Sequence, residues 1–252
     1  LKKLLLTLIV LILLLPYQQI NAESESPDIT AGAALLMDSK TSKILYSKNE
    51  NEKMYPASTT KIMTAILTIE NCNLDDIVTV PYDAIATIPS GYSIAALQTG
   101  EQLTVNQLLQ LMMVHSANDA ANVLAFHVAG SLESFATMMN TKVAELGLEH
   151  THFLNPSGMH NEDHYTTAYD LAKLMQYCMK NSTFRTIAGL KFCTVPATNK
   201  YGERIFTSTN ELLTLVDNRN VASNYYYKYA IAGKTGYTTE AKNCLVSVSN
   251  KD

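Results

Sequence analysis

Apolar-rich segments that are typical of β-strands lie near both ends of the chain. Residues 31–38 and 43–48 are two such segments, and the short polar stretch between them predicts a β-hairpin. Residues 229–235 and 244–249 form a second pair, joined by a polar turn. We therefore expect strands both to open and to close the folded part of the chain.

The middle of the chain has apolar residues at helical spacing. Pro56 precedes a predicted helix that carries Ser58 in its first turn and an apolar face along its length. Further helices are predicted in blocks within 104–147 and over 166–179. This order predicts an α/β (α+β) fold in which an antiparallel sheet is built from both termini, with a helical region between.

The first 22 residues have the pattern of a secretory signal peptide. Lys2 and Lys3 give a positive start, residues 4–15 form an apolar run, and Ala22 is a small residue suited to cleavage. The run is shorter than the ~20 residues that a spanning helix needs, and an uncleaved membrane anchor is the alternative. We expect an exported protein with a linker over 23–30 and one folded domain over 31–252.

Composition and charge exclude several classes of function. The chain has 252 residues, 47% of them hydrophobic, a net charge of −4 and no long basic run, so we expect a sizeable core and no nucleic-acid partner.

The four cysteines lack metal-type spacing, and free thiols are favoured over disulfides. His160 and His164 lie four residues apart without an HExxH pattern, so no metal and no cofactor are expected.

Ser58 and Lys61 form the first of three motifs that carry chemistry. Residues three apart share one face of a helix, so the Lys61 amine can reach the Ser58 hydroxyl. A lysine with a lowered pKa can take the serine proton, and the helix N-terminus offers N–H groups to an oxyanion. Alone the motif is weak, because a Ser-x-x-Lys pattern occurs by chance about once in a chain of this size, and the alternative is an ordinary exposed helix start.

Ser116 and Asn118 form the second motif, in a turn between two helical stretches. Such a turn can direct both side chains into one cleft. Ser116 could then relay a proton between Lys61, Ser58 and a leaving amine, while Asn118 could hydrogen-bond a substrate amide. The alternative is that either residue only caps a helix.

Lys234, Thr235 and Gly236 form the third motif, at the end of a predicted strand. An edge strand here can bind an extended peptide, with Lys234 and Thr235 facing a substrate carboxylate. Gly236 permits close backbone approach, and the N–H of Tyr237 could complete an oxyanion hole with that of Ser58. The alternative is an ordinary exposed hairpin.

The three motifs, in this order, form the constellation of the active-site serine penicillin-binding proteins and class A β-lactamases. With the stretches 56–63, 155–158, 164–171 and 233–238, the chain resembles the low-molecular-mass D-alanyl-D-alanine carboxypeptidases from about residue 29 onward. The resemblance implies a β-lactamase/DD-peptidase-like fold with 31–252 as the catalytic domain. It assigns Ser58 as acylated nucleophile, Lys61 as base, Ser116 and Asn118 to proton transfer and substrate holding, and Lys234 and Thr235 to the substrate carboxylate.

The resemblance also implies a reaction and partners. Ser58 would attack the carbonyl between two D-alanines of a peptidoglycan stem peptide, release D-alanine and be freed by water, while β-lactams would trap the acyl form. We expect action at the cell wall, on the outer face of the cytoplasmic membrane. Since the family's catalytic domain continues past the third motif, we also expect a truncated domain whose membrane anchor, if any, would follow Asp252.

Two other functions remain open from the residues. A class A β-lactamase would need a glutamate that activates the deacylating water, and no Glu-x-x-Leu-Asn context lies between Ser116 and Lys234. A non-catalytic binder of cell-wall peptide or β-lactam would not need the intact pair of Ser58 and Lys61. Both alternatives rank below the carboxypeptidase.

Overall fold

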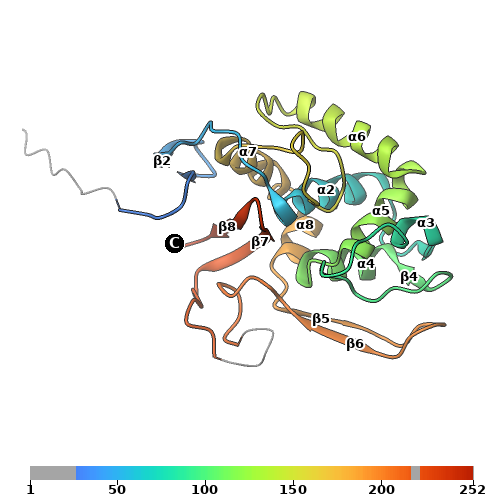
Figure 1. Ribbon diagram of the computed structural model, residues 1–252. Helices are drawn as coiled ribbons and strands as arrows, with labels where there is room; N and C mark the ends of the chain where they lie inside the picture. Colours follow the sequence, from blue (N-terminus) through green and yellow to red (C-terminus); the bar gives the residue numbers. More distant parts are fainter. Residues whose placement is uncertain (1–26, 217–221, 252) are drawn as a thin grey trace, which may run out of the picture. The chain divides into compact units, whose positions relative to one another are not determined.

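The secondary structure follows the order that the sequence predicts, with strands at the two ends and helices between (Figure 1). The structure is a computed structural model that describes residues 27–216 and 222–251. The expected signal peptide over 1–22 lies outside the described residues. The elements are β1 (Ala34–Met37), β2 (Ile44–Lys48), η1 (Ala57–Thr60), α2 (Lys61–Asn71), β3 (Ile77–Thr79), α3 (Tyr82–Ile85), β4 (Gln102–Thr104), α4 (Val105–Val114), α5 (Asn118–Ala129), α6 (Leu132–Glu145), α7 (Ala168–Cys178), α8 (Ser182–Ala188), β5 (Phe192–Val195), β6 (Arg204–Thr207), β7 (Ala230–Thr238) and β8 (Lys242–Ser249).

The chain divides after Ala31 into two units. The described residues of the first unit, 27–31, have no regular secondary structure. Every helix and strand, and the whole candidate site, belong to the second unit, which begins at Gly32.

Helices α2, α4 and α5 form the centre of the core. In α2, Ile62, Ala65 and Ile66 are at most 1% exposed, as their helical spacing predicts. Helix α4 begins at a capping box in which Thr104 and Gln107 satisfy each other's backbone N–H groups. Helix α2 contacts η1, which carries Ser58, and both α2 and α4 contact α8, which in turn packs against β7.

The strands form four antiparallel two-stranded sheets: β1–β2, β3–β4, β5–β6 and β7–β8. The mixed helix and strand content agrees with the expected class, and both predicted hairpins are present. Within the described ranges, however, β1–β2 and β7–β8 are separate sheets and not one sheet built from both termini. The turn and the alternation of apolar and polar residues set the register within each hairpin. Pairing between hairpins that are distant in the sequence depends on tertiary packing instead.

Strand β7 is the element that carries the third motif into the site. It was expected to end near residue 235 but continues to Thr238, with Gly236 opposite Cys244 and Tyr237 opposite Asn243. On its other side β7 packs against η1 and α8 (Figure 1). The motif therefore lies inside a strand, where cross-strand hydrogen bonds hold its backbone rigid.

From the sequence we expect free cysteines and no metal site. All four cysteines are free, with Cys178 and Cys193 buried. In residues 27–216 and 222–251, no group of histidine, cysteine or acidic side chains is arranged to hold a metal ion. None of the helices in that part of the chain has the length and apolar content needed to cross a membrane.

Candidate active site

Ser58 and Lys61 meet at the junction of η1 and α2. The Lys61 amine donates to the Ser58 hydroxyl at 2.9 Å, which is the contact expected from their spacing. Lys61 is fully buried, and its amine has two shorter contacts of 2.6 Å, to Asn118 Oδ1 and to the Ser157 carbonyl oxygen. These three contacts hold the amine in place beside the Ser58 hydroxyl.

The environment of Lys61 lowers its pKa well below the usual range of a lysine. Burial is the main cause, and the charge of Lys234 adds to it, while Asp119 acts in the opposite direction. A lowered pKa favours the neutral form of the amine. The neutral amine has a free electron pair and can accept a proton.

Backbone strain and close contacts surround the residue before Ser58. Ala57 has a φ of 46°, in the left-handed region that a residue with a Cβ rarely adopts. Gly158 lies against it so closely that a Cβ at this position would stand 1.8 Å from the Ala57 carbonyl oxygen. On the other side, a Cβ on Gly236 would stand 2.9 Å from the Ser58 nitrogen. The close approach of β7 to the Ser58 backbone therefore requires glycine at 236, as the sequence predicts.

Ser116 and Asn118 occupy the turn between α4 and α5, as expected. Ser116 has a φ of 63°, so the backbone turns sharply at this residue. The Asn118 N–H donates to the Ser93 carbonyl at 2.8 Å, and its side-chain oxygen accepts from Lys61. The second motif is thus a strained turn whose hydrogen bonds reach residues distant in the sequence. Asn118 is also the first residue of α5.

Lys234 is the second fully buried lysine of the site. Its amine donates to the Ser116 hydroxyl at 3.0 Å and to the Thr235 carbonyl at 2.8 Å. Burial lowers the pKa of Lys234 to about 7. Beside it, the hydroxyls of Thr235 and Thr209 are hydrogen-bonded at 2.6 Å. An anion that reaches this end of the site would find a cation and two hydroxyls together.

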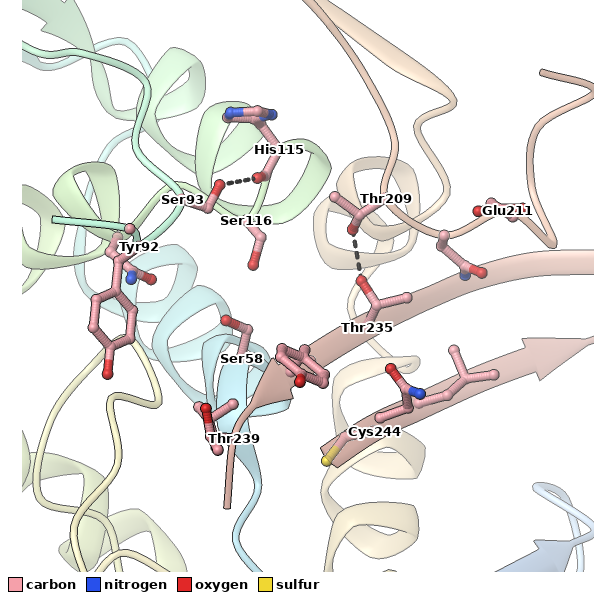
Figure 2. A pocket seen from close by; sticks show the side chains of 18 of the residues that line it. Ser58, Tyr92, Ser93, His115, Ser116, Thr209, Glu211, Thr235, Thr239 and Cys244 are labelled. Atoms are coloured by element: carbon pink, nitrogen blue, oxygen red, sulfur yellow. Dashed lines mark hydrogen bonds between the residues drawn. The ribbon is translucent and has the colours of Figure 1, made fainter. Parts of the chain in front are cut away.

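A cavity of about 800 Å³ opens over these groups. Figure 2 shows Ser58, Ser116 and Thr235 facing the same open space from three different elements. Asn118, Gly236 and Tyr237 also line it, whereas Lys61 and Lys234 lie behind the surface and are not exposed. The structure therefore brings together all eight residues that the sequence analysis singled out.

Two further groups, which the sequence did not predict, contact the site residues. The Ser157 carbonyl contacts Lys61, and the Thr209 hydroxyl contacts Thr235. Residue 157 lies in one of the stretches that resemble the family. Every residue has a main-chain carbonyl, however, so the residue type does not reveal this contact. Thr209 has no sequence signal at all, because a lone threonine after a strand is ordinary.

Solved structures of other proteins share this fold. The Streptomyces K15 DD-transpeptidase superposes with a TM-score of 0.79 at 36% identity, covering 90% of this chain and 87% of that one. A D-alanyl-D-alanine carboxypeptidase from Mycobacterium tuberculosis gives 0.78 at 29% identity, covering 89% and 80%. The fold is therefore that of the DD-peptidases, as expected.

Sequence comparison gives the family. Residues 20–252 match the peptidase family described as D-alanyl-D-alanine carboxypeptidase, and the chain belongs to that family. It is 33% identical to the D-alanyl-D-alanine carboxypeptidase DacF of Bacillus subtilis, over 99% of this chain and 63% of that protein. It is 37% identical to the D-alanyl-D-alanine carboxypeptidase of Streptomyces sp. K15, over 89% and 78%. The chain thus spans less than two thirds of the length of the Bacillus relative.

Proposed function

We propose that this protein is a serine-type D-Ala-D-Ala carboxypeptidase that removes the terminal D-alanine from peptidoglycan stem peptides through an acyl-serine intermediate. The observation that carries the proposal is the 2.9 Å contact between the Ser58 hydroxyl and a fully buried Lys61 amine whose pKa is lowered. Family membership agrees with this reaction.

The neutral Lys61 amine has two N–H bonds and one electron pair. Its two shortest contacts are to the oxygen atoms of Asn118 and Ser157, which can only accept. If the two N–H bonds point to these oxygens, the electron pair faces the Ser58 hydroxyl. Lys61 then takes the Ser58 proton while Ser58 Oγ bonds to the substrate carbonyl carbon.

The cavity supplies groups for the rest of the acylation step. The N–H groups of Ser58 and Tyr237 are the proposed donors to the oxyanion. Ser116 gives its hydroxyl proton to the leaving nitrogen as the C–N bond breaks, and the proton held by Lys61 restores Ser116. Lys234 and Thr235, with Thr209 beside them, bind the carboxylate of the leaving D-alanine. Asn118, whose oxygen is held by Lys61, keeps its amide N–H groups for the acyl part of the substrate.

Deacylation returns Ser58 to its first state. Lys61, neutral again, takes a proton from water as the water oxygen attacks the ester carbonyl, and then gives a proton to Ser58 Oγ. The hydrogen-bond partners of Lys61 are Ser58, Asn118 and the Ser157 carbonyl, with no carboxylate among them. A class A β-lactamase activates the deacylating water with a glutamate, and no Glu-x-x-Leu-Asn sequence lies between Ser116 and Lys234, so we expect slow release of penicillin.

The proposed place of action is outside the cytoplasmic membrane, where peptidoglycan lies. Residues 1–22 support this part of the proposal through their signal-peptide pattern. Stem peptides ending in D-Ala-D-Ala would be the substrates, and β-lactams would be covalent inhibitors.

Release of D-alanine from a diacetyl-L-Lys-D-Ala-D-Ala tripeptide tests the proposal. The unmodified protein should release one D-alanine per peptide, and Ser58→Ala should reduce the rate by at least ~10³-fold. Adding an amine such as glycine distinguishes hydrolysis from transfer, the activity named for the Streptomyces structure. No release from a folded protein, with or without the amine, would reject the carboxypeptidase.

A further inference from the structure

His164 lies between the element that carries the nucleophile and the loop over residues 154–159, away from the cavity. Its side chain is 2% exposed. Nδ1 accepts the backbone N–H of Leu154 at 3.0 Å, and Nε2 lies 2.8 Å from Thr60 Oγ1. Since Nδ1 must be unprotonated to accept from a backbone N–H, the ring proton is on Nε2 and is donated to Thr60.

The loop on the Nδ1 side holds the carbonyl that contacts Lys61. Asn155 Oδ1 accepts the backbone N–H groups of Ser157, Gly158 and Met159, which fixes the loop as a tight turn. The Asn155 amide nitrogen also lies 3.4 Å from His164 Nδ1. The turn places the Ser157 carbonyl oxygen 2.6 Å from the Lys61 amine.

The residue on the Nε2 side adjoins the catalytic lysine. Thr60 is fully buried and immediately precedes Lys61 at the start of α2. The ring of His164 therefore links the main chain next to Lys61 with the loop whose carbonyl accepts from Lys61. A shift of either side would change the distance between the Lys61 amine and the Ser157 carbonyl.

We infer that His164 is a positioning residue for acylation: its neutral ring holds the 154–159 loop and Thr60 at a fixed separation, so that Ser157 and Asn118 orient the Lys61 electron pair toward Ser58. The inference rests on the proposed function, because it assumes that Lys61 is the base. It adds a residue that never touches the substrate and acts only through Lys61.

The alternative is that the ring only fills space beside Phe153, at 5.4 Å between ring centroids. The two roles differ in their effect on pH dependence. Burial, together with the charges of His152 and His160, lowers the pKa of His164 to about 3, so this ring stays neutral throughout the range in which activity is measured. A change in the pH profile on replacing His164 therefore reports on another group, and Lys61 is the group at the other end of its contacts.

The test compares His164→Phe, which keeps a ring and removes both hydrogen bonds, with Thr60→Val, which removes only the acceptor of Nε2. His152→Phe is the matched control, because the His152 ring bonds the Asp163 carbonyl, which lies outside η1 and α2. The rate of acylation by a fluorescent penicillin is measured against pH for each full-length protein, together with the dissociation constant of the complex before acylation. His164→Gln, which can still donate and accept, tests for rescue.

We expect His164→Phe to acylate ~10²-fold more slowly, the loss typical of a displaced catalytic group, with an unchanged dissociation constant. The acid-side midpoint of the rate should move to higher pH, because water that enters beside Lys61 relieves the burial that lowers its pKa. Thr60→Val should move this midpoint in the same direction, and His164→Gln should move it less. His152→Phe should leave the midpoint unchanged. If His164→Phe does not fold, the shift in Thr60→Val decides.

Two results would overturn the inference. One is an unchanged midpoint in His164→Phe and Thr60→Val, with any loss of rate proportional to loss of folded protein. The other is an equal shift in His152→Phe. Absence of acylation in the unmodified protein would instead reject the proposed function itself, which keeps the two failures distinct.

Discussion

Lys61 and Lys234 are both fully buried, and the charge of Lys234 contributes to the lowered pKa of Lys61. Among the described residues neither amine forms a salt bridge. Buried cations without an anionic partner are costly, so burial favours the neutral form of each amine. A substrate carboxylate would supply the missing negative charge at Lys234 and leave Lys61 as the base.

Binding of a carboxylate substrate should weaken above pH 7. Lys234 has a pKa of about 7, so its charge is present below this pH and is lost as the pH rises. KM for a tripeptide with a free carboxylate should therefore rise above neutrality. Lys234→Arg, which stays charged, should show a flat KM over the same range. A flat KM in the unmodified protein would mean that Lys234 does not bind the carboxylate through its charge.

Removing the charge of Lys234 should stabilise the fold while impairing function. The pKa falls from 10.5 in the unfolded chain to about 7 on folding, so the unfolded state binds more protons between these values. Stability of the unmodified protein should thus rise with pH across this window. Lys234→Met should raise the free energy of unfolding by roughly 1 to 4 kcal/mol at neutral pH, less as the pH approaches 10.5. Urea unfolding checks this, and a less stable variant would contradict it.

The glycine at 158 should be essential for the shape of the site. A Cβ there would lie 1.8 Å from the Ala57 carbonyl, and the φ of +85° is unfavourable for alanine. Gly158→Ala should displace the backbone before Ser58 and reduce acylation by at least ~10²-fold. Gly202→Ala is the control, because nothing lies within 4 Å of a Cβ at that position. Equal activity of the two variants would show that the site tolerates movement at Ala57.

Thr209 should contribute to substrate binding through Thr235. Thr209→Val keeps the shape of the side chain and removes the 2.6 Å hydrogen bond to the Thr235 hydroxyl. One hydrogen bond of this kind is worth about 0.5 to 1.5 kcal/mol, so KM for the tripeptide should rise roughly two- to tenfold with kcat nearly unchanged. A loss in kcat with an unchanged KM would place Thr209 in the chemical step instead.

The sequence predicts the chemistry of this site better than its architecture. Ser58 and Lys61 could be paired because an i, i+3 spacing is a local property of a helix. The Ser157 carbonyl and Thr209 reach the site through tertiary packing, which no local pattern encodes. Strand β7 is longer than predicted. Gly236 weakens a strand prediction, but its pairing with Cys244 on β8 keeps the strand continuous.

Ser58 is the residue that we expect to be acylated, and a mass measurement shows this without relying on turnover. The protein is incubated with a penicillin, its intact mass is taken, and the adduct is mapped by peptide analysis beside Ser58→Ala. We expect one adduct per chain, on Ser58, and none in the variant. An adduct on another residue, or labelling that persists in Ser58→Ala, would contradict it.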